Sequence, residues 1–279
     1  MKRLICIALL AALLAGCAGE KPGGGVTFTD DLGREVTVES TGRVACLLGS
    51  FADVWYLAGG EVIAAADDAW EDFDLPLPGD AVNLGHTKNL SLEALFAAEP
   101  DFVIASSNTE GNVQWMPTLE AAGIPTAYFD GSVFDDYLRM LKLCTVLTGR
   151  EGLYQQNGLA VREQIDEAIA RAADRGTSPK VLYLRASATS IRAKNSRGSV
   201  LGEMLAALGC VNIADTDASL LENLSMEHIL LEDPDFIFFV QLGDDTAGTR
   251  ENMDRFFAEN PAWASLTAVR EDRVFVLDK

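Results

Sequence analysis

The sequence predicts an α/β fold of two Rossmann-like lobes joined by a single long helix. Three observations support this prediction. Short apolar runs of the β type alternate with helical patterns, one uninterrupted helical pattern extends over twenty or more residues, and a unit of fifteen residues occurs twice. Apolar strands that alternate with helices are typical of parallel sheets whose two faces are covered.

The chain begins with the pattern of an export signal. Lys2 and Arg3 precede the uncharged run Leu4–Ala15, which would rise about 18 Å as a helix, too short for a hydrocarbon core of roughly 30 Å. We therefore interpret residues 1–16 as a signal peptide. The small residues before Cys17 resemble a lipobox, so we expect cleavage before Cys17 and a lipid on its sulfur. An ordinary secretory signal with a chance cysteine at its end is the alternative.

An N-terminal lobe is expected over residues 26–149, after a polar, glycine-rich and lipidated tether over residues 17–25. The lobe opens with a strand pair, Val26–Thr29 and Glu35–Val38, which turns through Asp31-Leu32-Gly33. Buried strands are expected at Val44–Leu48, Val62–Ala66, Phe102–Ala105 and Thr126–Phe129. Helices are expected near Phe51–Ala58, Leu92–Ala98, Val113–Ala122 and Phe134–Leu147.

The long helical pattern separates this lobe from a second one. From Glu151 to about Asp174 the sequence has no proline and keeps helical spacing, and Gly176 and Pro179 then stand where a helix ends. We expect a connecting helix over residues 150–176, which would restrict movement of the lobes to a small hinge. A C-terminal lobe is expected over residues 177–279, with strands at Val181–Leu184, Phe236–Val240 and Val274–Leu277 and a helix near Val200–Leu208.

The repeated unit indicates that both lobes share one plan. LSLEALFAAEPDFVI begins at Leu90 and LSMEHILLEDPDFIF begins 134 residues later at Leu224, and six of the fifteen aligned positions are identical. Each copy predicts a serine N-cap, a short helix, a Pro-Asp turn and a buried strand.

Charge and cysteine content limit the class of protein. The chain has 42 Asp and Glu against 22 Lys and Arg, a formal net charge of −20, which argues against a nucleic-acid binder. Cys6 leaves with the signal peptide. The remaining Cys46, Cys144 and Cys210 have no CxxC spacing, and we interpret them as small buried residues rather than a disulfide framework.

Together these features resemble the ABC-transporter substrate-binding lipoproteins of the iron-siderophore, haem and cobalamin periplasmic-binding-protein family. The resemblance extends from about Thr27 to Lys279. Its specific parts follow one another as Asp31-Leu32-Gly33-Arg34-Glu35-Val36, Arg43-Val44, Leu90–Ile104, Val200-Leu201-Gly202-Glu203 and Gly209-Cys210-Val211-Asn212. Relatives usually carry a helix after the strand that ends here at Leu277, so the resemblance implies a C-terminal lobe without its last helix.

The resemblance implies an extracytoplasmic binding protein rather than an enzyme, with neither cofactor nor catalytic residue. It would be lipid-anchored to the cell membrane, in the periplasm or on the outer face, and deliver a ferric siderophore to an ABC permease with a cytoplasmic ATPase. Haem and a corrinoid such as cobalamin are alternative ligands. A surface hydrolase is a remote alternative, because the chain has no G-x-S-x-G elbow and no phosphate-binding loop. A lipid-anchored adhesion module is another.

The resemblance further implies that Glu93 and Glu227, at matching positions of the repeat, dock on arginines of the permease. With one carboxylate on each lobe, docking would depend on the separation of the lobes. A carboxylate also forms a directional pair with arginine. The alternative needs no partner. Each glutamate follows an N-cap serine by two residues, where a negative charge favours a helix by about 0.3 to 1 kcal/mol.

A ligand cleft is expected between the lobes, because ligands of open α/β sheets bind outside the carboxyl ends of the strands. Several relatives place a cationic contact at the positions of His86 and Lys88. Trp70 and Trp115 could each stack on a flat ligand, or could be rim or core residues. The candidates in the N-terminal lobe are Trp70, His86, Thr87, Lys88, Asn108 and Trp115.

The C-terminal candidates are basic. Arg185, Arg192, Lys194 and Arg197 lie within thirteen residues of a predicted loop and indicate a pocket for an anionic ligand such as a ferric catecholate or a propionate-bearing tetrapyrrole. A solvated basic loop is the alternative. Gln241 follows a predicted strand and completes the candidate set. Because two distant histidines do not supply three or four clustered ligands, we expect no bare-metal site, and a lone loop histidine is more often a hydrogen-bonding group.

Overall fold

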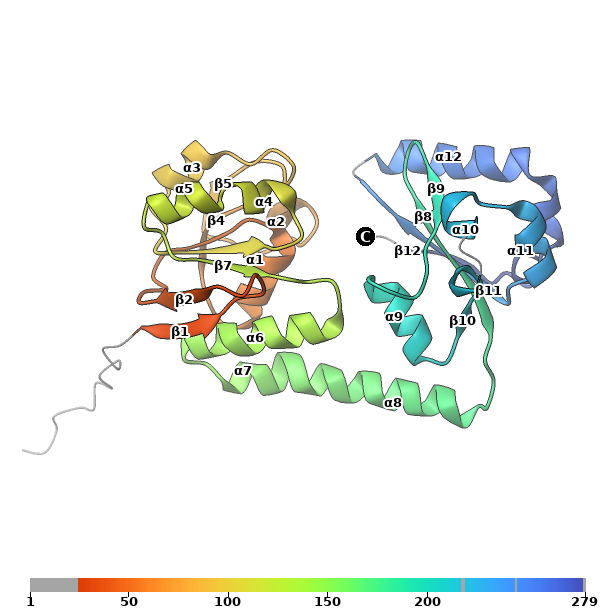
Figure 1. Ribbon diagram of the computed structural model, residues 1–279, viewed down its shortest axis with the longest axis horizontal. Coiled ribbons are helices and arrows are strands. Elements are labelled where there is room, and N and C mark those ends of the chain that lie inside the picture. Colours follow the sequence, from red (N-terminus) through yellow and green to blue (C-terminus); the bar gives the residue numbers. More distant parts are fainter. Residues whose placement is uncertain (1–24, 217–218, 244, 278–279) are drawn as a thin grey trace, which may run out of the picture.

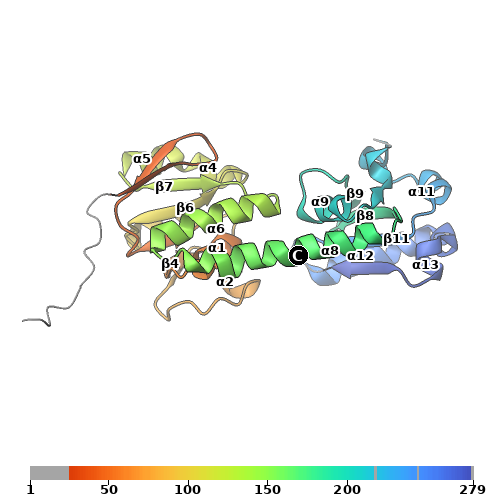
Figure 2. The same ribbon diagram turned by 90° about the horizontal axis from the view of Figure 1, so that it is seen from below.

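The computed structural model describes residues 25–216, 219–243 and 245–277. The predicted signal peptide, the predicted lipidation site Cys17 and the predicted tether up to residue 24 lie outside the described residues. Two α/β lobes lie side by side and a long helix extends along both, so the predicted fold class is confirmed (Figures 1 and 2). In the described part of the chain, no helix is long and apolar enough to span a membrane.

The N-terminal lobe contains an antiparallel hairpin and a five-stranded parallel sheet. The hairpin pairs β1 (Val26–Thr29) with β2 (Glu35–Val38), as predicted. The sheet has the order β5-β4-β3-β6-β7, and every neighbouring pair in it is parallel. Its strands are β3 (Val44–Cys46), β4 (Val62–Ala65), β5 (Val82–Asn83), β6 (Phe102–Ser106) and β7 (Thr126–Phe129).

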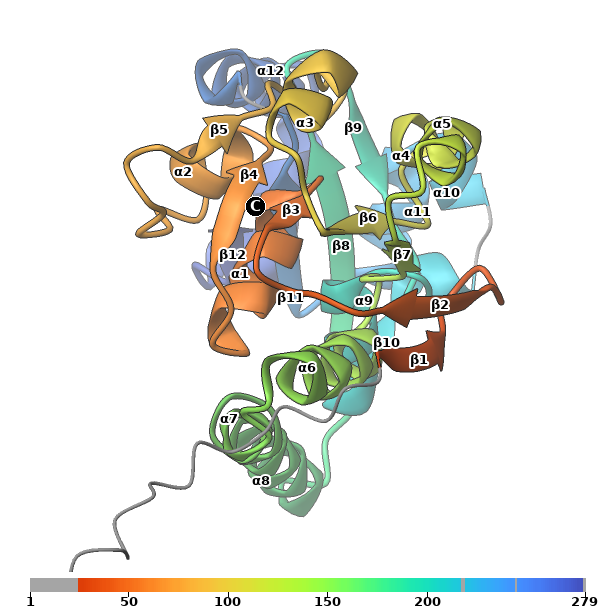
Figure 3. The same cartoon turned by 90° about the vertical axis from the view of Figure 1, so that its left-hand side faces the viewer.

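Helices cover both faces of this sheet (Figure 3). One core lies under α1 and α6 and another under α3 and α5. The predicted helix Val113–Ala122 is divided at Trp115 into α4 and α5, because Pro117 at the start of α5 has no N–H to continue the earlier helix. The helices are α1 (Gly49–Leu57), α2 (Asp68–Glu71), α3 (Leu92–Ala97), α4 (Glu110–Gln114), α5 (Met116–Ala121) and α6 (Phe134–Thr148).

The connecting helix is continuous but not uniform. It consists of α7 (Gly152–Tyr154), a π-helical turn (Gln155–Leu159) and α8 (Ala160–Asp174). No residue of α8 is fully buried, and its apolar residues Ile165, Ala168, Ile169 and Ala172 are half-buried.

The C-terminal lobe has a sheet of the order β10-β8-β11-β12, whose strands are parallel, with β9 antiparallel along β8. The strands are β8 (Lys180–Ala186), β9 (Ile191–Ala193), β10 (Val211–Asn212), β11 (Phe236–Gln241) and β12 (Val274–Leu277). The helices are α9 (Val200–Ala207), α10 (Ser219–Glu222), α11 (Met226–Glu232), α12 (Thr246–Glu259) and α13 (Thr267–Arg270), with 3-10 turns at Ile213–Asp215 and Pro261–Ser265.

The outer strand of this sheet is only partly covered. Phe275 of β12 stacks on Phe238 of β11, with 5.4 Å between the ring centres, and remains 42% exposed. Val276 and Leu277 are exposed as well.

Candidate functional site

The carboxyl ends of the N-terminal strands form one edge of the lobe, and the loops that follow them contact one another. The order of the strands reverses between β3 and β6, which is where open α/β sheets bind ligands. The N–H of Asp67, after β4, donates to the carbonyl oxygen of Gly85, after β5, at 3.1 Å. The N–H of Ser107, after β6, donates to the carbonyl oxygen of Phe129 on β7 at 2.9 Å.

Both candidate tryptophans pack against the hydrophobic interior. Trp70 lies on α2 and is half-buried against the core under α1 and α6. Trp115 lies between α4 and α5 and is half-buried against the core under α3 and α5. Their positions fit the core interpretation that the sequence left open beside the stacking one.

His86, Thr87 and Lys88 form a turn after β5. His86 and Lys88 are exposed and Thr87 is half-buried. The N–H of Lys88 donates to Nδ1 of His86 at 3.2 Å. This contact holds the imidazole over its own turn.

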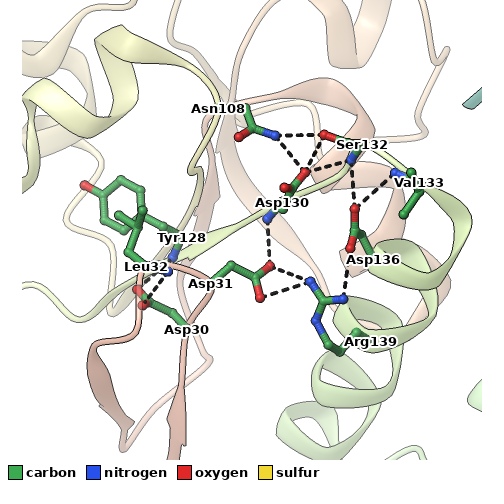
Figure 4. A network of polar contacts seen from close by, with 10 residues as sticks. All are labelled: Asp30, Asp31, Leu32, Asn108, Tyr128, Asp130, Ser132, Val133, Asp136 and Arg139. Atoms are coloured by element: carbon green, nitrogen blue, oxygen red, sulfur yellow. Dashed lines mark hydrogen bonds and ion pairs between the residues drawn. The ribbon is translucent and has the colours of Figure 1, made fainter. Parts of the chain in front are cut away.

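Asn108 belongs to a polar network beside β7 (Figure 4). Its Nδ2 donates to Oδ1 of Asp130 at 2.6 Å and to Oγ of Ser132 at 3.0 Å. Partial burial alone would raise the pKa of Asp130, but hydrogen bonds from Ser132 and Asn108 hold it below the ordinary value. The amide oxygen of Asn108 points away from both partners in Figure 4, and the residue is exposed.

The same network ties the N-terminal hairpin to the edge of the sheet. Oδ2 of Asp31 accepts from the N–H of Asp130 at 2.7 Å, and Arg139 on α6 donates to both carboxylate oxygens of Asp31 at 3.0 Å. Arg139 also pairs with Asp136 at 2.9 Å. The Asp31-Leu32-Gly33-Arg34 motif therefore anchors the hairpin, and Gly33 permits the turn because its φ is +77°.

Asp68 holds the loop after β4 against α1, a role that the sequence did not predict. Its Oδ1 accepts from the N–H of Gly49 at 2.8 Å and so caps α1 at the carboxyl end of β3. Only glycine fits at position 49, because a β-carbon would lie 2.5 Å from the nitrogen of Ala69. Burial raises the pKa of Asp68. Sequence offered only the acidic pair at 67 and 68 as a signal, since the capped residue lies 19 positions earlier.

The predicted loop from Arg185 to Arg197 is wrong at Arg185-Ala186, which belong to β8, and at Ile191–Ala193, which form β9. Arg185 lies on β8 and Arg192 lies directly opposite it on β9, so the two point to the same face. Strand β9 has only three residues, Ile191, Arg192 and Ala193. An apolar-polar alternation of this length is too short to predict a strand. Nε of Arg185 donates to the hydroxyl of Tyr183 at 2.9 Å.

This arginine pair has no acidic partner among the residues that the structure describes. Neither Arg185 nor Arg192 forms an ion pair with a described carboxylate. Like charges directly opposite each other destabilise a pair of strands. Two cations in this arrangement, in a chain with a net charge of −20, favour the binding of an anion.

Lys194 and Arg197 continue toward α9. Lys194 directly follows the end of β9, and its N–H donates to the carbonyl oxygen of Tyr183 on β8 at 2.9 Å. Arg197 is exposed and lines a cavity of about 310 Å³ together with Asn195 and Asp215. Because Asp215 accepts from the N–H of Ser196 at 2.7 Å, the cavity is mixed in charge rather than purely basic.

Gln241 ends β11 beside Ala186 of β8. Only 9% of the residue is exposed, and its Oε1 has no hydrogen-bond partner within the described chain. It shares a strand face with buried Ile237 and Phe239. A buried amide oxygen of this kind accepts a hydrogen bond from a water or from a bound molecule.

Glu93 and Glu227 occupy equivalent and exposed positions, in the first turns of α3 and α11. The predicted serine caps are confirmed. Oγ of Ser91 accepts from the N–H of Ala94 at 3.1 Å, and Oγ of Ser225 accepts from the N–H of His228 at 3.3 Å.

The likeness of the two repeats extends to the backbone. Glu99 and Asp233, which precede the proline of each copy, both have positive φ, of +47° and +43°. Strands β6 and β11 both begin three residues after this position.

The described residues contain no group of three or more histidine, cysteine or acidic side chains that could hold a metal ion. Cys46 and Cys144 are fully buried and Cys210 is partly buried, as small apolar residues would be. Burial raises the pKa of all three thiols, which keeps them protonated.

A family model identifies the family of this chain. The sequence profile described as "Periplasmic binding protein" matches residues 44–279. The iron-uptake system-binding protein of Bacillus subtilis is 23% identical over 193 residues, which cover 69% of this chain. The match spans 59% of that relative, which is less than two thirds of its length.

Solved structures show the same fold. IsdE of S. aureus complexed with haem has a TM-score of 0.68 at 16% identity, covering 85% of this chain and 89% of that one. The haem-binding protein RhuT of Roseiflexus sp. RS-1 has a TM-score of 0.66 at 22% identity, covering 86% and 90%. SirA of Staphylococcus aureus complexed with staphyloferrin B has a TM-score of 0.65 at 20% identity, covering 89% and 88%.

Proposed function

Because this chain belongs to the periplasmic binding protein family, we propose that it is the extracytoplasmic solute-binding component of an ABC importer. It captures an iron complex, foremost a ferric siderophore, and delivers it to a membrane permease. Haem or a corrinoid is the second candidate ligand. Both ligand classes occur among the structural neighbours, since SirA was solved with staphyloferrin B and IsdE with haem.

The observation that carries this proposal is the pairing of Arg185 with Arg192. Two guanidinium groups on neighbouring strands, without a described carboxylate partner, supply donors to an anionic ligand from one rigid sheet. Arg197 adds a third cation nearby in the sequence. Gln241 adds a buried acceptor at the same end of the sheet, on the face opposite to Arg185. An anionic chelate would therefore relieve the repulsion between Arg185 and Arg192.

The N-terminal lobe would contribute polar contacts from the loops after its strands. These are the turn of His86, Thr87 and Lys88 and the amide oxygen of Asn108, which points away from Asp130 and Ser132. Trp70 and Trp115 would support those loops from the core rather than stack on the ligand. The ligand would lie in a cleft between the lobes.

Binding would occur without chemical conversion. The ligand would then pass to a permease that Glu93 and Glu227 hold, one on each lobe, and a cytoplasmic ATPase would drive import. We further propose residues 1–16 as the signal peptide and Cys17 as the lipid anchor in the membrane. The N-terminal lobe would comprise residues 26–149, the connecting helix residues 150–176 and the C-terminal lobe residues 177–279.

A panel of ligands tests the proposal. Ferric catecholates, ferric hydroxamates, ferric polycarboxylates, haem and cobalamin are each added to the protein while its thermal unfolding is followed. A ligand present at 100 times its Kd should stabilise the fold by about 2.7 kcal/mol. If none of the panel shifts the transition, the proposed ligand class is wrong.

A double variant tests the arginine pair. Arg185→Ala with Arg192→Ala should weaken binding of the anionic chelate by about a hundredfold, because two charge-assisted contacts are lost. Arg171→Ala with Arg250→Ala removes the same charge from exposed helix positions and is the control. Equal affinities of the two double variants, measured by calorimetry, would remove the arginine pair from the site.

A further inference from the structure

The first part of the connecting helix is anchored in the N-terminal lobe. Nδ2 of Asn157 donates to the carbonyl oxygen of Leu57 at 2.7 Å, and the hydroxyl of Tyr137 donates to the carbonyl oxygen of Asn157 at 2.7 Å. Gly158 is buried, and a β-carbon there would lie 3.2 Å from the side chain of Leu138. The π-helical turn therefore lies where the helix is tied to α1 and α6 at once.

The anchoring ends one turn later. Arg162 forms an ion pair with Asp135 near the start of α6. In the described chain, residues 165–178 share no side-chain hydrogen bond and no ion pair with either lobe, and the Arg171–Glu167 pair at 3.6 Å lies within α8. The apolar side chains of α8 belong to none of the described hydrophobic cores.

The helix reaches the C-terminal lobe through four exposed residues, 175–178. Gly176 has a φ of +62°, and a β-carbon there would meet nothing within 4 Å. The chain is held again at Lys180, whose N–H donates to Oδ2 of Asp235 at 2.8 Å. A short, exposed segment between a continuous helix and a well-held strand is the kind of place where a hinge absorbs changes in φ and ψ.

We propose that the N-terminal lobe and the connecting helix form one rigid body, and that the C-terminal lobe turns against this body at residues 175–178. The 15 residues of α8 extend about 22 Å, so the hinge lies well away from the N-terminal lobe. Rotation there moves the C-terminal lobe alone. A hinge in the π-helical turn would instead carry the helix along with that lobe. The proposal concerns the fold and holds whatever ligand the protein binds.

Distances between paired spin labels test the hinge in the full chain without ligand. Labels on a non-natural amino acid avoid the native cysteines. The first pair joins Thr118 on α5 to Glu167 on α8, and the second joins Glu167 to Arg250 on α12, all exposed positions. We expect a narrow distance distribution for the first pair and one about twofold broader for the second. A first distribution as broad as the second would overturn the proposal, and so would two equally narrow ones.

A substitution in the anchor gives an independent test. Asn157→Ala removes the contact with Leu57 and should broaden the first distribution while the second stays unchanged. Gln156→Ala changes an exposed neighbour in the same π-helical turn and should alter neither distribution. If Asn157→Ala also leaves the first distribution unchanged, the helix is not anchored as proposed.

Discussion

Asp30 is the residue that joins the N-terminal hairpin to the sheet. It is 5% exposed, and its carboxylate accepts from Nη2 of Arg34 at 2.7 Å and from the N–H of Tyr128 at 3.2 Å. Arg34 in turn donates to the carbonyl oxygen of Thr126 at 2.8 Å and pairs with Glu120. One buried carboxylate therefore holds together segments almost 100 residues apart.

Removal of this carboxylate should be costly. Asp30→Ala leaves Arg34 partly buried without its main partner and should lower the free energy of unfolding by about 3 kcal/mol. Urea denaturation measures the loss. Glu35→Ala, an exposed change on neighbouring β2, should alter the stability by less than about 0.5 kcal/mol. Similar losses for both variants would contradict the assigned role.

Asp130 should make stability depend on pH in a defined direction. Hydrogen bonds from Ser132 and Asn108 hold its folded pKa below the ordinary value, against the effect of burial. The native protein therefore binds this proton less readily than the unfolded chain does. The contribution is fully present above the unfolded pKa of about 4 and is lost as the pH falls through the folded pKa. Asp130→Asn should thus be less stable than the wild type at pH 6, and the difference should shrink below pH 4. A difference that is constant between pH 6 and pH 3 would refute this.

At the scale of elements, the two repeats form the same structure with different support. Glu99 and Asp233 both adopt left-handed backbone after their helices. The carboxylate of Asp233 accepts from the N–H and the hydroxyl of Thr267, both at 2.7 Å. Glu99 is exposed, and its side chain makes no hydrogen bond within the described residues.

This difference predicts opposite effects of glycine. Glu99→Gly relieves left-handed strain and should raise the free energy of unfolding by about 0.5 to 1 kcal/mol. Asp233→Gly relieves the same strain but removes two hydrogen bonds, so it should lower the free energy of unfolding by about 1 kcal/mol. Thermal and chemical denaturation of the two variants measure the signs. Equal signs would show that the backbone alone decides stability at these turns.

Elements with a strong local pattern were predictable, and those without one were not. Strand β7 and the hairpin strands have the predicted bounds because their apolar and turn residues mark them directly. Helix α12 was missed, since only Thr249 and Met253 of it are buried and most of its remaining residues are polar or small. Strand β9 was missed because it is stable only beside β8.

At the scale of the whole molecule, the two lobes each present one exposed glutamate at the start of a short helix. The reversal of both charges tests the proposed docking. Glu93→Lys with Glu227→Lys should abolish import of the bound chelate while ligand affinity stays unchanged, because neither side chain belongs to the proposed ligand site. Glu110→Lys with Glu222→Lys reverses two other exposed first-turn charges, one on each lobe, and should leave import intact. Import by the Glu93/Glu227 variant would refute the docking role.

The sequence by itself determined the fold class, the serine caps of the repeat and most strands, because burial patterns and cap residues act within a few positions of the chain. Only the tertiary structure decided which side chains meet. It placed Arg192 opposite Arg185, joined Asn108 to Asp130, buried the oxygen of Gln241 and turned Trp70 and Trp115 toward the core. These contacts depend on strand register and on the packing of segments far apart in the chain. Local periodicity specifies which face of an element is buried, but it does not specify the neighbour against which that face packs.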